Sequence, residues 1–183
     1  ILGTTSQTAG YARALEERMH GVADRYANID RIVAVAHTEG GTPYKPNNLD
    51  LLLRTLAGFA VHPNVGAVLA VDYGTETITN EILRAYMEEN GYPINDVVHE
   101  FLTMRAGFEK ELERGEGVVS EWFDTVNATA RTEQSAAHLK IVLQCGGSDA
   151  FSGISGNPLA AWVVREIIRS GGAANLAETD ELI

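Results

Sequence analysis

The stretch LKIVLQCGGSDAFSGISGNPLAAW, residues 139–162, carries the strongest fold signal in the chain. An apolar run stops at Cys145, the only cysteine of the sequence, and a glycine-rich segment leads into a second apolar run with helical periodicity. Asn157 and Pro158 suit a helix start, because Asn accepts free amide hydrogens and Pro has none to leave unpaired. The stretch therefore predicts a strand, a loop over residues 145–157 and a helix that begins near Pro158.

The same alternation of short apolar runs and longer amphipathic segments extends over the whole chain. The apolar runs are typical of parallel strands buried on both faces, and they are Ile1–Thr5, Ile32–Ala36, Ala67–Asp72, Asp96–Leu102, Lys140–Gln144 and Ala173–Ala177. The helical patterns cover Thr8–Tyr26, Asn48–Ala60, Thr77–Asn90, Ala106–Gln134 and Pro158–Ser170. The fourth pattern is expected to break near Gly115. The sequence thus predicts one α/β domain over residues 1–183, with a three-layer, mainly parallel, doubly wound (Rossmann-like) sheet.

Composition narrows the class of protein. The net charge is −11, with 14 Lys and Arg against 25 Asp and Glu, and no basic stripe offsets it, so nucleic acid is not an expected partner. No apolar run approaches the roughly 20 residues that cross a bilayer, so no membrane is expected. A single cysteine fits a reducing compartment, and we expect a cytoplasmic protein. Since both ends of the chain have strand-like patterns, we expect a domain from a longer chain with flanking domains; the assembly state, a homo-oligomer included, is left open.

In a doubly wound sheet, ligands bind at the carboxyl ends of the strands. His37 and Glu39 follow the second predicted strand, and the loop that starts at Cys145 follows the fifth. We therefore expect His37, Glu39 and residues 145–152 on one rim of the sheet. His37 and Glu39 suit a base with its orienting group, or metal ligands. The alternative, favoured by the two residues alone, is a loop histidine bonded to the backbone.

The glycine-rich loop also allows two interpretations. Its glycines let the backbone approach a ligand, and a loop that enters a helix N-terminus offers unpaired amides to a carboxylate or phosphate. The other interpretation is a tight strand-to-helix connection. The predicted substrate-binding residues in this loop are Gly146, Gly147, Ser148, Ser152 and Asn157. Because like charges repel, we expect Asp149 to face a metal, a substrate hydroxyl or backbone amides of the loop.

Four segments in this order give a family resemblance. AHTEGG (36–41), LLLRTLAGFAVHPNVGAVLAV (51–71), LQCGGSDAFSGISGNPLAA (143–161) and GGAANLAET (171–179) together resemble the altronate and galactarate dehydratases, a family that includes the large subunit of sulfolactate sulfo-lyase. The resemblance covers essentially the whole chain and corresponds to a central domain. It implies a hydro-lyase that acts on a small-molecule sugar acid such as altronate or galactarate and uses a divalent metal, commonly iron.

The chain departs from this family pattern where the family usually has cysteines. Members usually read His-Thr-Glu-Gly-Cys-Gly where this chain has Gly41, and Gly-Cys-Glu where it has Thr75. Members often place a cysteine after Thr-Ser, and here Gln7 follows Thr5-Ser6. Cys145 is thus the remaining soft candidate ligand for the metal.

The resemblance indicates which residues form the site but does not assign a catalytic role to each of them. Dehydration removes a proton beside a carboxylate and expels a β-hydroxyl, which needs a base, an acid and stabilisation of the enediolate. We expect His37 as the base and Glu39 or Asp149 as the acid or orienting group. The loss of cysteines leaves a second hypothesis, in which the chain is a non-catalytic sugar-acid-binding or subunit-contact domain without the metal.

Overall fold

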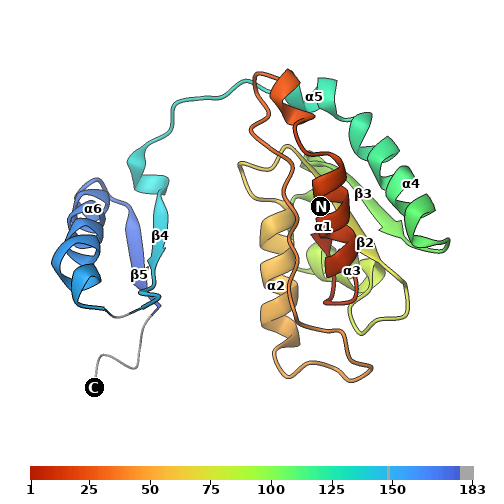
Figure 1. The fold of residues 1–183 in the computed structure, drawn as a ribbon, viewed down its shortest axis with the longest axis horizontal. Helices are drawn as coiled ribbons and strands as arrows, with labels where there is room; N and C mark the ends of the chain where they lie inside the picture. The colour runs from red at the N-terminus through yellow and green to blue at the C-terminus, as the bar shows by residue number, and fades with distance from the viewer. Residues whose placement is uncertain (148, 178–183) are drawn as a thin grey trace. The chain divides into compact units, whose positions relative to one another are not determined.

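The computed structural model describes residues 1–147 and 149–177, and these divide into two compact units between Ala130 and Arg131 (Figure 1). The sequence predicts one domain with one sheet, whereas each unit has its own small parallel sheet. Ala67–Asp72 and Ile141–Leu143 therefore lie in different sheets, and the prediction of one continuous doubly wound sheet is wrong. The coarser prediction, an α/β fold with parallel strands, is confirmed.

The first unit is built on a three-stranded parallel sheet in the order β1-β2-β3, surrounded by helices. Its strands and helices are β1 (Leu2–Gly3), α1 (Ala9–Arg18), α2 (Leu49–Ala60), β2 (Ala67–Asp72), α3 (Asn80–Glu89), β3 (Val98–Thr103), α4 (Phe108–Ser120) and α5 (Phe123–Asn127), with single 3₁₀ turns at Ala23–Arg25 and Ile94–Asp96.

The central strand β2 supplies both hydrophobic cores of this unit. Val68 and Ala70 pack with residues of α2 and α3, while Leu69 and Val71 pack with residues of α1 and α4. Because successive side chains of a strand point to opposite faces, an uninterrupted apolar run is what a strand covered by helices on both sides requires. This explains why β2 was predicted with its exact bounds from the sequence.

The predicted strand Ile32–Ala36 is not a regular strand. It forms one parallel bridge, between Val35 and Leu2. In this bridge the Val35 amide donates to the Ile1 carbonyl, and the Gly3 amide donates to the Val35 carbonyl. Only this short piece of backbone pairs with β1, because β1 itself has two residues. The pairing nevertheless determines the position of His37, two residues after Val35.

The predicted break near Gly115 does not occur: helix α4 continues through this residue to Ser120. Gly115 lies where α4 touches α1: a Cβ at this position would overlap the Tyr11 hydroxyl and lie 2.8 Å from Cδ2 of Leu15. The buried Tyr11 hydroxyl donates to the Glu111 carbonyl at 2.7 Å. Burial, followed by the Glu111 charge, raises the pKa of Tyr11 to about 12. The glycine is thus a packing residue rather than a helix breaker.

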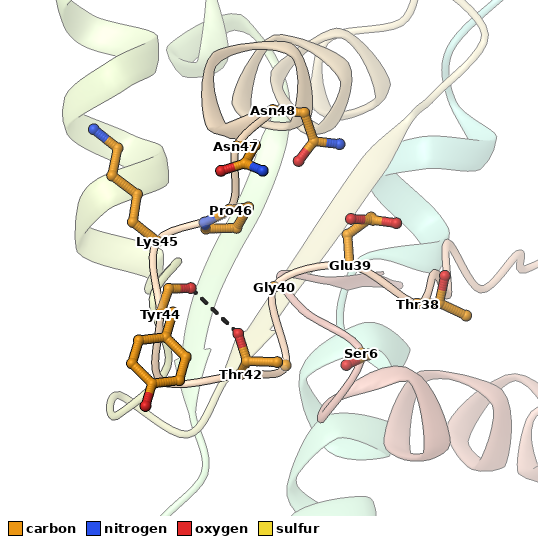
Figure 2. A pocket seen from close by; sticks show the side chains of 11 residues that line it. Ser6, Thr38, Glu39, Gly40, Thr42, Tyr44, Lys45, Pro46, Asn47 and Asn48 are labelled. Carbon is orange, nitrogen blue, oxygen red and sulfur yellow. Dashed lines mark hydrogen bonds between the residues drawn. The ribbon is translucent and has the colours of Figure 1, made fainter.

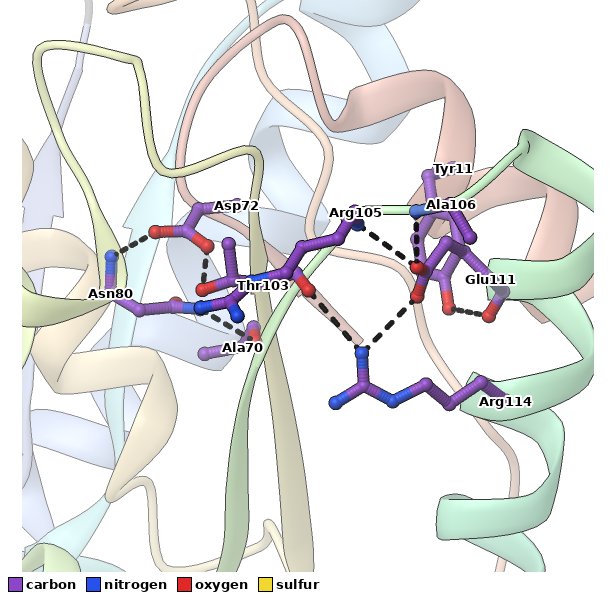
Figure 3. A network of polar contacts seen from close by, with 9 residues as sticks. All are labelled: Tyr11, Ala70, Asp72, Asn80, Thr103, Arg105, Ala106, Glu111 and Arg114. Carbon is purple, nitrogen blue, oxygen red and sulfur yellow. Dashed lines mark hydrogen bonds and ion pairs between the residues drawn. The ribbon is translucent and has the colours of Figure 1, made fainter.

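Two buried carboxylates hold helices of this unit to the sheet (Figure 3). Asp72, at the end of β2, accepts from the backbone amide of Asn80 at 2.7 Å and from its side-chain amide at 3.1 Å. Glu111 accepts from the backbone amides of Arg105 and Ala106 at 2.9 and 2.8 Å. Both carboxylates therefore satisfy amides at the start of a helix or in the loop before it.

The second unit contains a strand–helix–strand motif. Its elements are a 3₁₀ turn at Ala136–His138, β4 (Lys140–Leu143), a π-helical segment Ser152–Gly156, α6 (Asn157–Arg169) and β5 (Ala173–Leu176). Strands β4 and β5 pair in parallel, with Lys140 opposite Ala173 and Leu143 opposite Leu176. No helix among the described residues is both long and apolar enough to cross a membrane.

The packing of α1 against α4 can be tested with two glycines of the same helix. Gly115→Ala should lower the stability of the first unit by about 1–3 kcal/mol, because the new methyl group displaces Tyr11 and overpacks the contact. Gly117→Ala is the matched control, since a Cβ there meets nothing within 4 Å. It should stabilise α4 by about 0.5–1 kcal/mol. Urea unfolding followed by Trp122 fluorescence, in a Trp162→Phe background, measures both; equal effects of the two substitutions would contradict this packing.

A second test uses the charge on Glu111. Burial alone would raise the pKa of Glu111, but the Arg105 and Ala106 amides and the Arg114 guanidinium outweigh it and lower the pKa from the ordinary 4.5. A lowered carboxyl pKa stabilises the fold above the unfolded pKa and loses that effect as the pH falls through the folded pKa. Glu111→Gln should therefore cost on the order of 1 kcal/mol at pH 7, and the difference from the unsubstituted chain should shrink below about pH 4.5. Melting curves at several pH values measure it, and a constant difference would contradict the assignment.

Candidate functional site

The carboxyl ends of β1 and β2 are surrounded by three polar loops: residues 4–8, residues 37–48 and residues 73–79. Thr4, Thr5 and Thr8 are fully buried and bond to the backbone rather than to solvent. The Thr4 hydroxyl donates to the Val71 carbonyl at 3.2 Å, and the Thr8 hydroxyl donates to the Thr5 carbonyl at 3.0 Å. The first loop is therefore held by internal bonds and by a bond to β2.

His37 is half-buried, and both of its ring nitrogens contact the backbone. Nε2 lies 3.0 Å from the Gly3 carbonyl, and Nδ1 accepts from the Glu39 amide at 3.2 Å. This is the alternative of a loop histidine bonded to the backbone. The role of His37 as a base stays a prediction, and in this conformation neither ring nitrogen is available to a substrate.

The following residues, Glu39 and Gly40, are held against the loops after β1 and β2. The Ser6 amide donates to the Glu39 carbonyl at 2.8 Å, and the Thr77 hydroxyl donates to the Gly40 carbonyl at 3.1 Å. Gly40 has φ +70°, and a Cβ on it would lie 3.2 Å from Cγ2 of Thr5. A glycine is needed at this turn because a side chain would be both strained and crowded.

An open pocket of about 510 Å³ lies beside these residues (Figure 2). Its lining is mostly polar and consists of Ser6, Thr38, Glu39, Gly40, Gly41, Thr42, Tyr44, Lys45, Pro46, Asn47 and Asn48. The Glu39 and Asn48 side chains extend toward one another, whereas Lys45 points away from them. Within the described part of the chain, neither the Glu39 carboxylate nor the Lys45 ammonium has a hydrogen-bond or ion-pair partner. A pocket with one unengaged carboxylate, one ammonium and several amides and hydroxyls suits a hydroxylated, charged small molecule.

Sequence reasoning missed Asp72 and Glu76, two buried acids at the same edge. Glu76 accepts from the amides of Tyr73 and Thr75 at 2.7 and 3.1 Å, and so braces the turn after β2. A signal existed, because both residues flank a glycine directly after a buried strand. Their carboxylates are engaged by backbone amides, unlike that of Glu39.

In the second unit, the predicted loop over residues 145–157 is largely helical. Helical turns start at Ala150 and continue through the π-helical segment Ser152–Gly156 into α6. The predicted helix start near Pro158 agrees with the bounds of α6, which begins at Asn157. The predicted cap is wrong, because Asn157 is already helical, with φ −65° and ψ −42°, and helical turns precede it. A wider turn before Pro158 is the physical reason the helix can pass through it, because proline has no amide to donate and its ring crowds the carbonyl four residues earlier.

Asp149 caps this earlier helix start. Its carboxylate accepts from the Ser152 amide and from the Ser152 hydroxyl, each at 2.9 Å. These two bonds lower the pKa of Asp149. Of the three expected arrangements, the structure has the one in which Asp149 turns to backbone amides.

The other predicted residues of this loop make no site among themselves in the described residues. Cys145 is a half-buried free thiol, Gly146, Gly147 and Asn157 are exposed, and Ser148 lies outside the described residues. His37 and Glu39 belong to the first unit, whereas Cys145, Asp149 and Ser152 belong to the second. A shared rim for these two groups stays a prediction, although the single sheet from which it was derived is not formed.

Comparison with known proteins gives a family for both units. Residues 1–127 match the family described as D-galactarate dehydratase/altronate hydrolase, second domain, and residues 136–183 match the one described as D-galactarate/altronate dehydratase, C-terminal. The chain belongs to the galactarate and altronate dehydratase family. The resemblance seen in the sequence is thereby confirmed.

Three curated relatives illustrate how much of such a protein this chain represents. It is 28% identical to altronate dehydratase of Escherichia coli (strain K12) and 30% identical to altronate dehydratase of Bacillus subtilis (strain 168); all of the chain matches 36% and 35% of these proteins. It is 26% identical to galactarate dehydratase (L-threo-forming) of E. coli, where 71% of the chain matches 26% of that protein. The chain thus spans about a third of the altronate dehydratases. No solved structure matches it significantly.

The described residues do not fit the soft-metal site that the resemblance implies. No group of three or more His, Cys, Asp or Glu side chains in residues 1–147 and 149–177 is placed to hold a metal ion. Where family cysteines are expected, Gln7 donates its side-chain amide to the Gly41 carbonyl at 3.0 Å, and a Cβ on Gly41 would overlap Ser6. A hydrogen bond and close packing replace thiols here. Iron, and Cys145 as its ligand, stay predictions.

The capping role of Asp149 can be tested by exchange of one amide. Asp149→Ala should speed hydrogen exchange of the Ser152 amide and lower the helix content, because the first turn loses its acceptor. Asp149→Asn is the matched control, since Asn caps helices about as well as Asp. Hydrogen exchange by NMR measures both variants. The same Ser152 exchange rate in Asp149→Ala as in the unsubstituted chain would contradict the cap.

Proposed function

We propose that this chain is part of a hydro-lyase of sugar acids and that the Glu39 pocket binds the acid. The observation that carries the proposal is the pocket itself: it lies at the carboxyl end of a parallel sheet and contains a carboxylate and an ammonium without partners in the described residues. Family membership and the names of the relatives, altronate dehydratase and galactarate dehydratase, support this substrate class.

The lining offers a role for each chemical feature of a sugar acid. In the described conformation Lys45 points away from Glu39. Turned toward the pocket on its flexible stem, its ammonium supplies the counter-charge for a carboxylate. The amides of Asn47 and Asn48 and the hydroxyls of Ser6 and Thr42 suit a row of substrate hydroxyls. The net charge of −11 makes a positive group at the pocket more important, since the protein as a whole repels an anion.

Glu39 is the group in the pocket that can move a proton. In the proposed reaction its carboxylate removes the hydrogen on the carbon beside the substrate carboxylate. The electron pair forms a carbon–carbon double bond as the β-hydroxyl leaves, and the protonated Glu39 returns its proton to the leaving hydroxide, which releases water and restores the carboxylate; the enol product then becomes a ketone. The chain's described residues supply binding and this proton transfer, and a divalent metal, if the whole protein holds one, supplies electrostatic stabilisation of the enediolate.

A second candidate is the non-catalytic sugar-acid-binding or subunit-contact domain. The Gln7–Gly41 hydrogen bond favours it, because it occupies a place where a thiol is expected. Exposed apolar side chains of the second unit, among them Phe151, Ile154 and Trp162, also suit a contact with another domain or subunit. Binding without turnover in the whole protein would support this candidate.

Ligand titration tests the pocket. Galactarate and altronate should bind to the chain, and Lys45→Gln should weaken binding about tenfold, the effect of losing one charge-assisted bond. The affinity for galactitol, which has hydroxyls and no carboxylate, should be the same in Lys45→Gln as in the unsubstituted chain. Calorimetry measures the affinities, with Glu89→Gln, an exposed acid outside the pocket, as the control. Galactarate binding that is unchanged by Lys45→Gln would contradict the assignment.

A further inference from the structure

The hydrogen bonds of His37 define its chemical state. A carbonyl oxygen can only accept, so Nε2 must carry the hydrogen that goes to Gly3. A backbone amide can only donate, so Nδ1 must carry the lone pair that accepts from Glu39. The imidazole is therefore the neutral Nε2–H tautomer.

This ring connects β1 to the acid of the pocket. The Glu39 amide is held by His37, and the Glu39 carbonyl is held by the Ser6 amide at 2.8 Å. Both backbone groups of Glu39 are thus fixed, on one side through the imidazole to Gly3 and on the other to the loop after β1. Its carboxylate lines the pocket and has no hydrogen-bond or ion-pair partner in the described residues.

We propose that His37 is a positioning residue that sets the place of Glu39, and that it is not the base. This inference rests on the proposed function, in which Glu39 exchanges the proton. A base needs a free lone pair within reach of the substrate, and the lone pair of His37 is used by the Glu39 amide. The histidine acts through the backbone of Glu39 and holds the carboxylate at the pocket.

The tautomer can be tested without any ligand. Two-bond ¹H–¹⁵N NMR spectra of the chain at neutral pH distinguish an Nε2–H from an Nδ1–H imidazole and both from imidazolium. The expected result for His37 is the Nε2–H form. The Nδ1–H form or the imidazolium would overturn the proposal whatever the chain binds.

Two conservative substitutions separate the two bonds. In His37→Asn the side-chain oxygen can take the place of Nδ1 and accept from the Glu39 amide; in His37→Gln the side-chain amide can take the place of Nε2 and donate to Gly3. The Glu39 carboxylate, held in place, can accept a hydrogen bond from a hydroxyl of galactarate. Galactarate affinity should therefore fall about five- to tenfold in His37→Ala and be partly restored in His37→Asn, but not in His37→Gln. The melting temperature should not follow this order.

His62→Asn is the matched control, because Nδ1 of His62 also accepts an amide two residues later, that of Asn64, and His62 does not line the pocket. It should leave galactarate affinity unchanged. If the unsubstituted chain does not bind galactarate, the proposed function is wrong, and the NMR measurement of the tautomer still tests the hydrogen bonds of His37. If the unsubstituted chain and His37→Ala bind galactarate equally well, the positioning role of His37 is wrong, but the proposed binding of the acid in the pocket is supported.

Discussion

The parallel pairing of β2 with β1 and β3 is the constraint on which the first unit depends. It leaves the carboxyl ends of the strands as the place where three connecting loops meet, and their amides and carbonyls must find partners there. Asp72, Glu76, Thr4 and Thr8 supply those partners and are buried. The exposed Glu39 stands out against this background, because the other two acids at this edge are already bonded to amides. What makes it a candidate for chemistry is therefore the engagement of its neighbours.

The elements marked by a clear local sequence pattern could be predicted, whereas features that depend on contacts between residues far apart in the sequence could not. An uninterrupted apolar run identified β2, since burial on both faces leaves no polar positions. The apolar run of β4 also predicted a strand, although Lys140 and Val142 of that strand are exposed. Gly115 looked like a break because glycine weakens a helix, and only the approach of Tyr11 explains it. Asn157-Pro158 looked like a helix start for a sound local reason, yet Asp149 supplies a cap eight residues earlier, and the π-helical segment lets the chain continue through the proline.

Of the predicted site residues that the structure describes, only Glu39 lines the pocket, and the roles of all of them stay predictions. His37 and Glu39 do follow the bridge that Val35 forms with Leu2, and Glu39 lines a pocket. Their roles depend on which nitrogen faces which backbone group, and sequence spacing carries no such information. The assumption of a single sheet joined them to Cys145 and Asp149; two sheets in two units remove that reason, because strand order is set by long-range pairing that apolar runs alone do not specify.

The contact between Gly41 and Ser6 has a consequence for the shape of the pocket. A side chain at position 41 needs the space that the Ser6 hydroxyl now fills, so a larger residue there requires Ser6 to turn or move. Gly41 is also bonded through its carbonyl to the side chain of Gln7. The size of residue 41 therefore couples one wall of the pocket to the loop that follows β1.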